Sequence, residues 1–326
     1  MRIAVTRVIP DAGLDLLRDA AEVVVWPEPL PPDRDQLVQL AEGADGLLTL
    51  LTERVDGDLL DRLPTVKVVS NMAVGYDNID VEACTARGVA VCTTPDVLTE
   101  TTADLAFALL MAVARRLVES YDVVRAGGWR TWEPMGFLGP DVHGATLGIV
   151  GLGRIGQAVA RRARGFAMRI LYTNRQREPD LEAKLGVEWR DLDGLLAESD
   201  FVSLHVPLTP ATRGLIGREQ LRRMRPGAIL INTARGPIVQ TDALLEAVEQ
   251  GWIWGVGLDV TDPEPLPADH PLLRHPRVLV TPHIASASYQ TRARMAELAA
   301  QNVLAVLRGE TPPRCLNPEV LTRDSA

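Results

Sequence analysis

Short apolar runs alternate with longer segments of mixed polarity along the whole chain. Such runs are typical of strands buried in a parallel sheet, and apolar residues at helical spacing between them indicate covering helices. In the first part of the chain we expect strands at Ile3–Ile9, Val23–Trp26, Gly46–Leu51, Val66–Ser70 and Val89–Thr93, and helices at Ala12–Ala20, Arg34–Glu42, Gly57–Leu63 and Val81–Arg87. This alternation predicts a parallel sheet with helices on both faces.

A second alternating region follows, with six expected strands: Leu147–Val150, Met168–Tyr172, Phe201–Val206, Ala228–Asn232, Gly255–Val260 and Val278–Thr281. Helices are expected at Thr99–Tyr121, Thr241–Gln250 and Ser288–Arg308. A further helix is expected between the first two of these strands, and it ends at about Gly165. A proline-bearing tail from Pro312 is expected to be extended. The aromatic, poorly periodic segment Gly127–Pro140 is either a contact with a partner chain or an ordinary surface loop.

Composition limits the class of protein. A chain of 326 residues with 46% apolar residues can form two domains with large cores. No apolar run approaches the ~20 residues that span a membrane, and the chain starts as a strand without the pattern of a signal peptide. The three cysteines show no metal-ligand spacing or disulfide framework, which favours a cytoplasmic protein without a metal site. A net charge of −9 argues against nucleic acid as the main partner.

A glycine-rich turn joins the first two strands of the second region. It reads Gly151-Leu152-Gly153-Arg154-Ile155-Gly156 and lies between an apolar run and a helical pattern, as in the first βαβ unit of a dinucleotide-binding domain. The first glycine allows the tight turn, the second admits a pyrophosphate, and the third lets the helix pack closely on the sheet. The N–H groups and positive dipole end of the helix favour phosphate.

The end of the next strand indicates which dinucleotide binds. NAD-type domains place an acid about 20 residues beyond the glycines, on the ribose 2′-OH. Here the strand continues into Asn174-Arg175-Gln176-Arg177, with no acid before Glu178. Because an arginine can hold a 2′-phosphate through charge-assisted hydrogen bonds, this pattern favours NADP. The alternative is that Arg175 and Arg177 are solvated surface charges.

A turn in the first region is a candidate anion site. Val74-Gly75 follows the expected strand Val66–Ser70, and ligands of open α/β sheets bind beyond the carboxyl ends of strands. The backbone N–H groups of this pair can receive a small anion such as a carboxylate. An ordinary glycine turn is the alternative.

Three candidate chemical groups follow the strands of the second region: Arg235, Glu264 and His283. A guanidinium holds a carboxylate by two contacts, and an imidazole suits the acid–base step of a carbonyl–alcohol interconversion. A neighbouring glutamate would fix the imidazole tautomer and favour its protonated form. Taken singly, each has a structural alternative. Arg235 can be part of a surface ion pair, Glu264 an acid in a turn, and His283 a histidine at a strand end whose hydrogen bonds are satisfied. His205 also ends a strand and is a weaker candidate.

The motifs GLGRIG, INTARG, GLDVTDPEPLP and TPHIASAS, in this order and spacing, resemble the D-isomer-specific 2-hydroxyacid dehydrogenase family. NMAVGYDNID, TPDVLTETTADLA and GRIGQAVARR are most similar to its glyoxylate/hydroxypyruvate reductase branch. The resemblance implies an α/β protein with two doubly wound domains, a Rossmann cofactor domain (99–287) inserted into a flavodoxin-like substrate-binding domain (1–98 plus 288–326). It also implies a homodimer.

The same resemblance implies the activity and its residues. The expected reaction is NAD(P)H-dependent reduction of small 2-keto acids, glyoxylate or hydroxypyruvate, with NADP preferred and NAD as the alternative cofactor. His283 is the implied acid–base group, Glu264 its partner, and Arg235, with the Val74 and Gly75 amides, the carboxylate holder. The implied cofactor contacts are Gly151, Leu152, Gly153, Arg154, Ile155, Gly156, Asn174, Arg175, Gln176, Pro207, Thr233, Ala234, Arg235, Asp259, His283 and Ala285.

Some positions depart from the family pattern, and other functions stay open. Ala285 stands where glycine is common, which adds a methyl group near the expected nicotinamide, and Trp252 and Trp254 are bulkier than usual. Within the family, a D-lactate or phosphoglycerate specificity is the alternative. A non-enzymatic dinucleotide-sensing scaffold is the alternative from another class, although no long basic or disordered appendage supports it.

Overall fold

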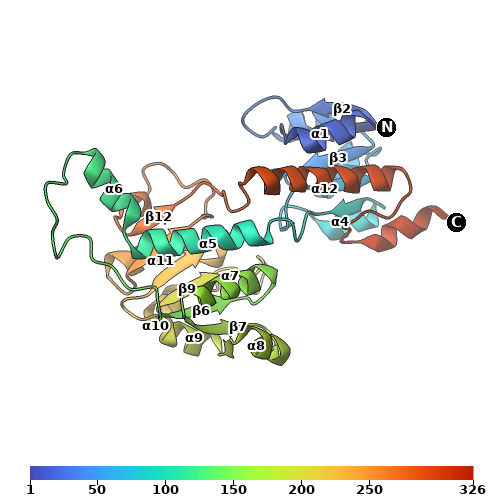
Figure 1. The fold of residues 1–326 in the computed structure, drawn as a ribbon. Coiled ribbons are helices and arrows are strands. Elements are labelled where there is room, and N and C mark those ends of the chain that lie inside the picture. The colour runs from blue at the N-terminus through green and yellow to red at the C-terminus, as the bar shows by residue number, and fades with distance from the viewer. Residues whose placement is uncertain (326) are drawn as a thin grey trace. The chain divides into compact units, whose positions relative to one another are not determined.

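The computed structural model describes residues 1–325 and divides the chain into two compact units (Figure 1). Unit 1 combines Met1–Leu98 with the chain from Ser286 onward, and unit 2 is the continuous stretch Thr99–Ala285. Unit 1 is therefore formed from both ends of the chain, and unit 2 is inserted between them.

The sheet of unit 1 has five parallel strands. They are β1 (Arg2–Val5), β2 (Glu22–Val25), β3 (Gly46–Thr49), β4 (Val68–Asn71) and β5 (Ala90–Cys92), in the order β2-β1-β3-β4-β5. This is the flavodoxin-like order of doubly wound sheets. Four of these strands end earlier than expected, whereas β4 runs one residue beyond its expected end, to Asn71.

Helices cover both faces of this sheet. They are α1 (Asp11–Arg18), α2 (Arg34–Ala41), α3 (Gly57–Arg62), α4 (Val81–Ala86) and α12 (Tyr289–Leu307), and a 3-10 helix, η3 (Pro318–Ser325), follows. Asp33, Asp56 and Asp80 each accept an N–H of the first turn of α2, α3 and α4, which explains where these helices begin. On the other face α12 packs on α1, where a Cβ on Gly13 would lie 2.7 Å from Ala296. Close packing against α12 therefore requires glycine at this position.

The sheet of unit 2 has seven parallel strands in the order β12-β11-β10-β9-β6-β7-β8. They are β6 (Thr146–Val150), β7 (Arg169–Thr173), β8 (Glu188–Trp189), β9 (Phe201–Leu204), β10 (Ile229–Asn232), β11 (Gly255–Leu258) and β12 (Val278–Val280). The strand order reverses between β6 and β9, and ligands of such sheets bind at the carboxyl edge near this point. Two parallel, doubly wound sheets confirm the predicted fold class.

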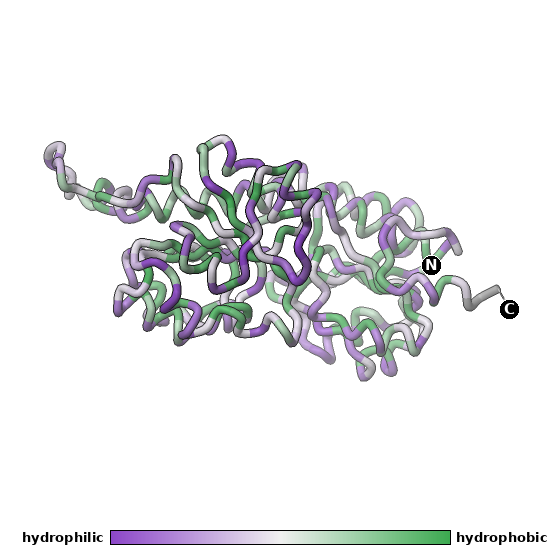
Figure 2. Tube along the Cα trace, turned by 90° about the horizontal axis from the view of Figure 1, so that it is seen from below, coloured by the Kyte–Doolittle hydropathy of each residue, from purple (hydrophilic) through white to green (hydrophobic). Residues whose placement is uncertain are grey.

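Two helical layers cover the sheet of unit 2. On one face α5 (Thr99–Ala114) and α7 (Arg154–Gly165) form a core with β6, β7 and β10. On the other face α9 (Leu192–Glu198), α10 (Arg218–Arg223) and α11 (Thr241–Glu249) pack on the same strands. The remaining elements are α6 (Leu117–Arg125), α8 (Pro179–Leu185), η1 (Gly236–Ile238) and η2 (Pro271–Arg274). Figure 2 shows hydrophobic stretches alternating with hydrophilic ones along the trace.

Two sequence expectations about elements are wrong. The single helix Thr99–Tyr121 is broken, because Arg116 takes a left-handed φ of +51° between α5 and α6. Its guanidinium donates to Glu119 over 2.8 Å and lies 5.0 Å from the ring of Phe137, contacts that fix the new direction. The tail is not extended throughout, since Pro318–Ser325 form η3. No pattern predicted β8, α8, α9 or α10, which are short.

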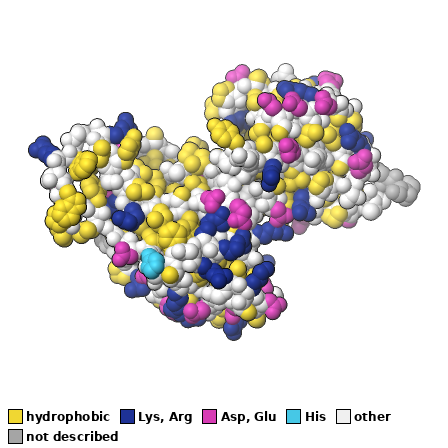
Figure 3. All heavy atoms as spheres, viewed as in Figure 1, with side chains coloured by type: hydrophobic (Ala, Val, Ile, Leu, Met, Phe, Trp, Pro, Cys, Tyr) yellow, Lys and Arg dark blue, Asp and Glu magenta, His cyan; other side chains and the backbone are white. Residues whose placement is uncertain are grey.

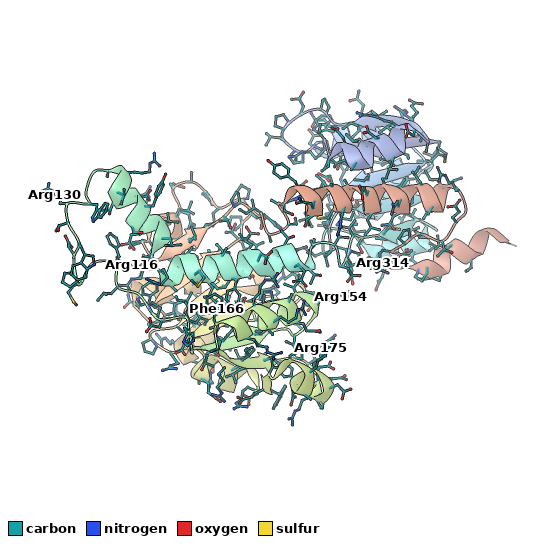
Figure 4. The ribbon with its side chains drawn as sticks, in the orientation of Figure 1. Arg116, Arg130, Arg154, Phe166, Arg175 and Arg314 are labelled. Atoms are coloured by element: carbon teal, nitrogen blue, oxygen red, sulfur yellow. The ribbon has the colours of Figure 1, made fainter. Side chains whose placement is uncertain are left out.

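Residues 117–141, here called the arm, extend away from the body of unit 2 (Figure 1). Helix α6 has no buried residue. The arm exposes Leu117, Val118, Tyr121, Val124, Trp129, Trp132, Met135, Phe137 and Leu138. In Figure 3 yellow hydrophobic side chains gather on this side of the molecule, and Figure 4 places Arg130 on the loop beyond α6. An apolar surface of this kind is typical of an interaction face.

The two bulky tryptophans beside β11 have a structural explanation. The guanidinium of Arg222 lies 4.3 Å and that of Arg218 5.9 Å from the ring of Trp252. Arg277 lies 5.2 Å from the ring of Trp254, which also packs on the core beneath α5. Both tryptophans therefore act as packing surfaces for arginines. Among the residues that the structure describes, no helix combines the length and the apolarity needed to cross a bilayer.

Candidate active site

The strand order of unit 2 brings the three candidate groups to one edge of the sheet. Arg235 follows β10, Glu264 follows β11 and His283 follows β12. These strands are parallel and adjacent, so their carboxyl ends lie side by side. Sequence spacing alone could not establish this, because neighbours in the sheet need not be neighbours in the chain.

Glu264 and His283 are in direct contact. The Nδ1 atom of His283 lies 2.6 Å from Oε1 of Glu264, and the N–H of Thr261 donates to Oε2 over 3.3 Å. Partial burial by itself raises the pKa of Glu264, but the hydrogen bond and charge of His283 outweigh it and leave that pKa below its usual value. The carboxylate is therefore ionised at neutral pH, and it fixes a proton on Nδ1.

The loop that carries Arg235 is held against the loop that carries Glu264. The side chain of Asn232 accepts the N–H of Ala234 over 3.0 Å and donates to the carbonyl of Arg235 over 2.9 Å. A Cβ on Gly236 would lie only 1.8 Å from the carbonyl oxygen of Thr261. Only glycine permits this approach, and it places the guanidinium charge close enough to Glu264 to help lower its pKa.

The backbone at His283 is strained and firmly held. Its φ of +54° lies in the left-handed region, which a non-glycine residue rarely adopts. The N–H of His283 donates to the carbonyls of Asp259 and Thr281, each over 3.0 Å. The Asp259 carboxylate, 1% exposed, accepts the N–H groups of Ile284 and Ala285 over 2.8 Å. Through these hydrogen bonds to the loop backbone, Asp259 fixes the direction in which the imidazole points.

His205 does not match the requirements of an acid. It follows β9, and its Nε2 lies 2.8 Å from Oγ of Ser203. Burial lowers the pKa of His205 to about 4, so the ring is neutral at physiological pH. A neutral ring of this kind has no proton readily available for transfer, which leaves His283 as the candidate acid.

The glycine turn after β6 has the geometry that phosphate binding requires. Gly151 has a φ of +101°, and a Cβ there would lie 2.9 Å from the backbone of His205. A Cβ on Gly156 would lie 2.2 Å from the carbonyl oxygen of Gly151. A Cβ on Gly153 meets nothing within 4 Å, so this side of the turn is open. Gly153 is also the N-cap of α7, and no side chain caps this helix.

Asn174 and the arginines after β7 have different roles. The side chain of Asn174 accepts the N–H of Leu152 over 2.7 Å, which ties the end of β7 to the glycine turn. Arg177 donates to both carboxylate oxygens of Glu182 over 2.7 Å. Arg175 forms no hydrogen bond or ion pair within residues 1–325. Figure 4 shows Arg154, at the start of α7, and Arg175 toward the same side of unit 2.

These residues fit a dinucleotide. The uncapped N–H groups of α7, the open side of Gly153 and the cationic Arg154 suit a pyrophosphate. Beyond β10, the hydroxyl of Thr233 is buried and lacks a hydrogen-bond partner among the described residues. A buried polar atom of this kind is normally satisfied, so Thr233 is suited to a ligand group. Along the same edge lie Ile155, Gln176, Pro207, Ala234 and the buried Ala285.

In unit 1, the Val74-Gly75 turn follows β4 and is stiffly held. The side chain of Asn71 donates to the carbonyl of Gly75 over 3.0 Å and to Asn78 over 3.3 Å. Asn78 in turn donates to the carbonyls of Leu50 and Glu53. Within the described part of the chain, the N–H groups of Val74 and Gly75 donate to no acceptor.

Sequence reasoning missed the residues that position others. Asn71, Asn232 and the backbone-binding role of Asp259 are the main ones. All three share a signal that was available in the sequence, namely a polar side chain at or just after the end of an apolar strand run. Such a residue is buried by its strand, so it must bond to the turn that follows.

Comparisons with known proteins agree with this geometry. Residues 107–285 match the model for the NAD binding domain of the D-isomer specific 2-hydroxyacid dehydrogenases. A glyoxylate reductase of Korarchaeum cryptofilum is 53% identical over 321 residues, which cover 98% of this chain and 97% of that protein. A Thermus thermophilus protein of solved structure is 50% identical with a TM-score of 0.92, covering 97% of this chain and 100% of that one.

A further solved structure is an NADPH-dependent glyoxylate/hydroxypyruvate reductase of Sinorhizobium meliloti in complex with NADP and malonate. It is 34% identical, with a TM-score of 0.86, and covers 97% of this chain and 96% of that one. Fold and site define a two-unit α/β protein with a dinucleotide-type glycine turn and an Arg-Glu-His set at one sheet edge. The chain belongs to the D-isomer-specific 2-hydroxyacid dehydrogenase family.

Proposed function

We propose that this protein reduces small 2-keto acids, glyoxylate or hydroxypyruvate, to the corresponding 2-hydroxy acids with NAD(P)H. The observation that carries the proposal is the 2.6 Å contact between His283 and Glu264, on the strand edge that also bears Arg235. The names of close relatives, glyoxylate reductases among them, support the substrate class. The proposed substrate-binding domain is 1–98 plus 288–326, and the proposed NAD(P)-binding domain is 99–287. Ala326 lies outside the described residues.

The proposed roles follow from the chemistry of each side chain and, for His283, from the ring nitrogen that does not contact Glu264. Nδ1 of His283 is engaged by Glu264, so Nε2 is the atom that gives its proton to the carbonyl oxygen of the substrate. Arg235 binds the substrate carboxylate and stabilises negative charge that develops on the reacting oxygen. The Val74 and Gly75 amides are further donors for the carboxylate. When bound, the reduced nicotinamide supplies the hydride to the keto carbon.

For the cofactor, we propose that NADPH is preferred over NADH. Asn174 is occupied with the glycine turn and Arg177 with Glu182, so Arg175 is the proposed partner of the 2′-phosphate. No carboxylate precedes Glu178 after β7 that would repel a phosphate. The NADPH-dependent relative of known structure supports the same preference.

For the assembly, we propose a homodimer in which the arm packs on a second copy of the chain. A helix with no buried residue is marginal on its own, and the exposed aromatic side chains of the arm gain stability only when covered. A closed, two-fold pairing is the commonest way in which one chain covers its own apolar surface.

The test is a direct assay of the purified protein with glyoxylate and NADPH, followed by the loss of NADPH absorbance. Consumption that depends on the keto acid and is faster with NADPH than with NADH supports the proposal. A panel with hydroxypyruvate, pyruvate and phosphohydroxypyruvate then ranks the substrates. Tight NADPH binding without turnover on any keto acid would contradict the proposed activity and favour a dinucleotide-sensing role.

A further inference from the structure

The segment after α12 returns along β5 and is fixed there by the side chain of Asn317. Its amide oxygen accepts the N–H of Val91 over 2.8 Å, and its amide nitrogen donates to Val89 and Thr85 over 2.9 Å. The N–H of Leu316 donates to the carbonyl of Val91 over 2.8 Å. The segment around Cys315 and Leu316 is therefore an antiparallel neighbour of β5.

This pairing places Cys92 opposite Cys315. The hydrogen bond from Leu316 to Val91 belongs to the adjacent position, so the cysteines occupy a non-hydrogen-bonded antiparallel pair. In such pairs the Cα atoms lie about 4.5 Å apart. Disulfides accept Cα separations of about 4.4 to 6.8 Å, so a pair of this kind falls within the range. The backbone can therefore accept a disulfide in place.

The two thiols differ in access and acidity. Cys92 is fully buried, whereas Cys315 is partly exposed. The thiol of Cys315 donates to Oδ1 of Asn317 over 3.5 Å. The neighbouring thiol of Cys92 lowers the pKa of Cys315, and the pKa of Cys92 is itself raised by Cys315 and by burial. The third cysteine, Cys84, is buried on α4, and burial raises its pKa to about 11. Cys315 is thus the thiol with both thiolate character and access.

We propose that Cys315 and Cys92 are a reversible oxidation site that hydrogen peroxide converts into an intramolecular disulfide. The thiolate of Cys315 attacks one peroxide oxygen, the O–O bond breaks, and the released hydroxide takes a proton to become water. The sulfenic acid on Cys315 is then attacked by the sulfur of Cys92, which loses its proton. The S–O bond breaks, the S–S bond forms and a second water leaves.

The bond would join the two separate chain segments from which unit 1 is formed. Cys92 lies before the chain leaves for unit 2, and Cys315 lies after it has returned. In the reduced protein no covalent bond joins the segment around Cys315 to β5, and hydrogen bonds hold it there. In the oxidised protein this segment cannot detach while the bond is intact, so the chain before Cys315 becomes more resistant to proteolysis.

The experiment treats the purified full-length protein with hydrogen peroxide and measures its intact mass under denaturing, non-reducing conditions. We expect the loss of two hydrogen atoms, a Cys92–Cys315 cross-linked peptide, and full reversal by dithiothreitol. Cys84→Ser should behave like the wild type, whereas Cys315→Ala, which alters a partly exposed side chain, should abolish the loss. Carboxypeptidase should shorten the oxidised protein more slowly than the reduced one.

Three results would overturn the proposal. They are added oxygen on Cys315 without a cross-link, a disulfide between two chains, and a cross-link that involves Cys84. Because none of these readouts uses keto-acid turnover, they are independent of the proposed enzymatic function.

Discussion

The carboxylate of Asp259 accepts the backbone N–H of Ala285 over 2.8 Å, two residues beyond His283 in the chain. Its other oxygen accepts the N–H of Ile284 and the hydroxyl of Thr281, so one buried side chain fixes the whole loop after β12. A carboxylate suits this position because both oxygens only accept hydrogen bonds, whereas an amide would turn an NH₂ group toward one of the donors.

Asp259→Asn should therefore disturb the orientation of the His283 imidazole. Losing one charge-assisted hydrogen bond costs ~1.5–3 kcal/mol, which corresponds to a roughly 10- to 100-fold fall in kcat/KM if the loop is displaced. Asp262→Asn, on the exposed part of the next loop, is the matched control and should retain activity. Steady-state kinetics and thermal unfolding of each variant distinguish a misplaced imidazole, which lowers kcat/KM, from an unfolded protein, which lowers Tm. Unchanged kcat/KM in Asp259→Asn would contradict this positioning role.

His283→Ala should remove most of kcat while NADPH binding stays close to that of the wild type. Proton transfer by a positioned side chain contributes typically ~10²–10⁴-fold, and that range is the expected loss. The exposed His143→Ala serves as control. Turnover and NADPH fluorescence titration give the two quantities. Near-normal turnover in His283→Ala would show that another group supplies the proton.

Glu264→Gln should shift the pH dependence of reduction. The amide keeps a side chain of similar size but cannot ionise, whereas the wild-type carboxylate has a lowered pKa and stays charged into the acid range. Reductive activity of the wild type should therefore fall where Glu264 takes up a proton, and the variant should lack this acid limb. Profiles of kcat/KM against pH in both directions measure this shift. Superimposable profiles would leave Glu264 as an orienting group only.

The same pair predicts a stability difference with a defined pH window. Because the pKa of Glu264 is lowered in the folded protein, its stabilising effect is fully present above the unfolded value of ~4.3. The effect is lost as pH falls through the lower folded value. The Tm difference between the wild type and Glu264→Gln should therefore shrink on acidification below that range.

Arg175→Ala should raise KM for NADPH far more than KM for NADH. One charge-assisted contact to the 2′-phosphate is worth ~1.5–3 kcal/mol, or roughly 10- to 100-fold. Arg177→Ala is the matched control, because this arginine is already paired with Glu182. Equal effects of Arg175→Ala on both cofactors would contradict the assignment.

Charge on the arm should separate the proposed dimer. Tyr121 and Val124 are 60% and 52% exposed on α6, so aspartate at both positions costs the isolated chain little but opposes apolar contact with a second copy. Sedimentation velocity should give a dimer for the wild type and a monomer for the double variant. Tyr289→Asp, at a side chain that is 96% exposed and outside the arm, should remain dimeric. A wild-type monomer would contradict the proposed assembly.

Apolar periodicity predicted most of the strands and both parallel sheets, because buried parallel strands produce long uninterrupted apolar runs. It could not predict the contact between Glu264 and His283, which depends on β11 and β12 being neighbours in the sheet. It also missed the break at Arg116, because the local pattern there is compatible with a continuous helix and the turn is fixed by Glu119 and Phe137. The pairing of Cys92 with Cys315 depends on residues far apart in the sequence.

The discontinuous make-up of unit 1 sets the order in which the protein folds during synthesis. The helix that covers β3, β4 and β5 on one face, α12, begins at Tyr289, long after the strands themselves have been made. At ordinary elongation rates the ribosome needs roughly 10 to 40 s to get from Leu98 to that helix. Unit 2, an unbroken stretch of chain, is complete at Ala285, before the first residue of α12 is added. Until α12 is made, the apolar strand positions that it covers stay exposed on the nascent chain, and transiently exposed surface of this kind favours aggregation.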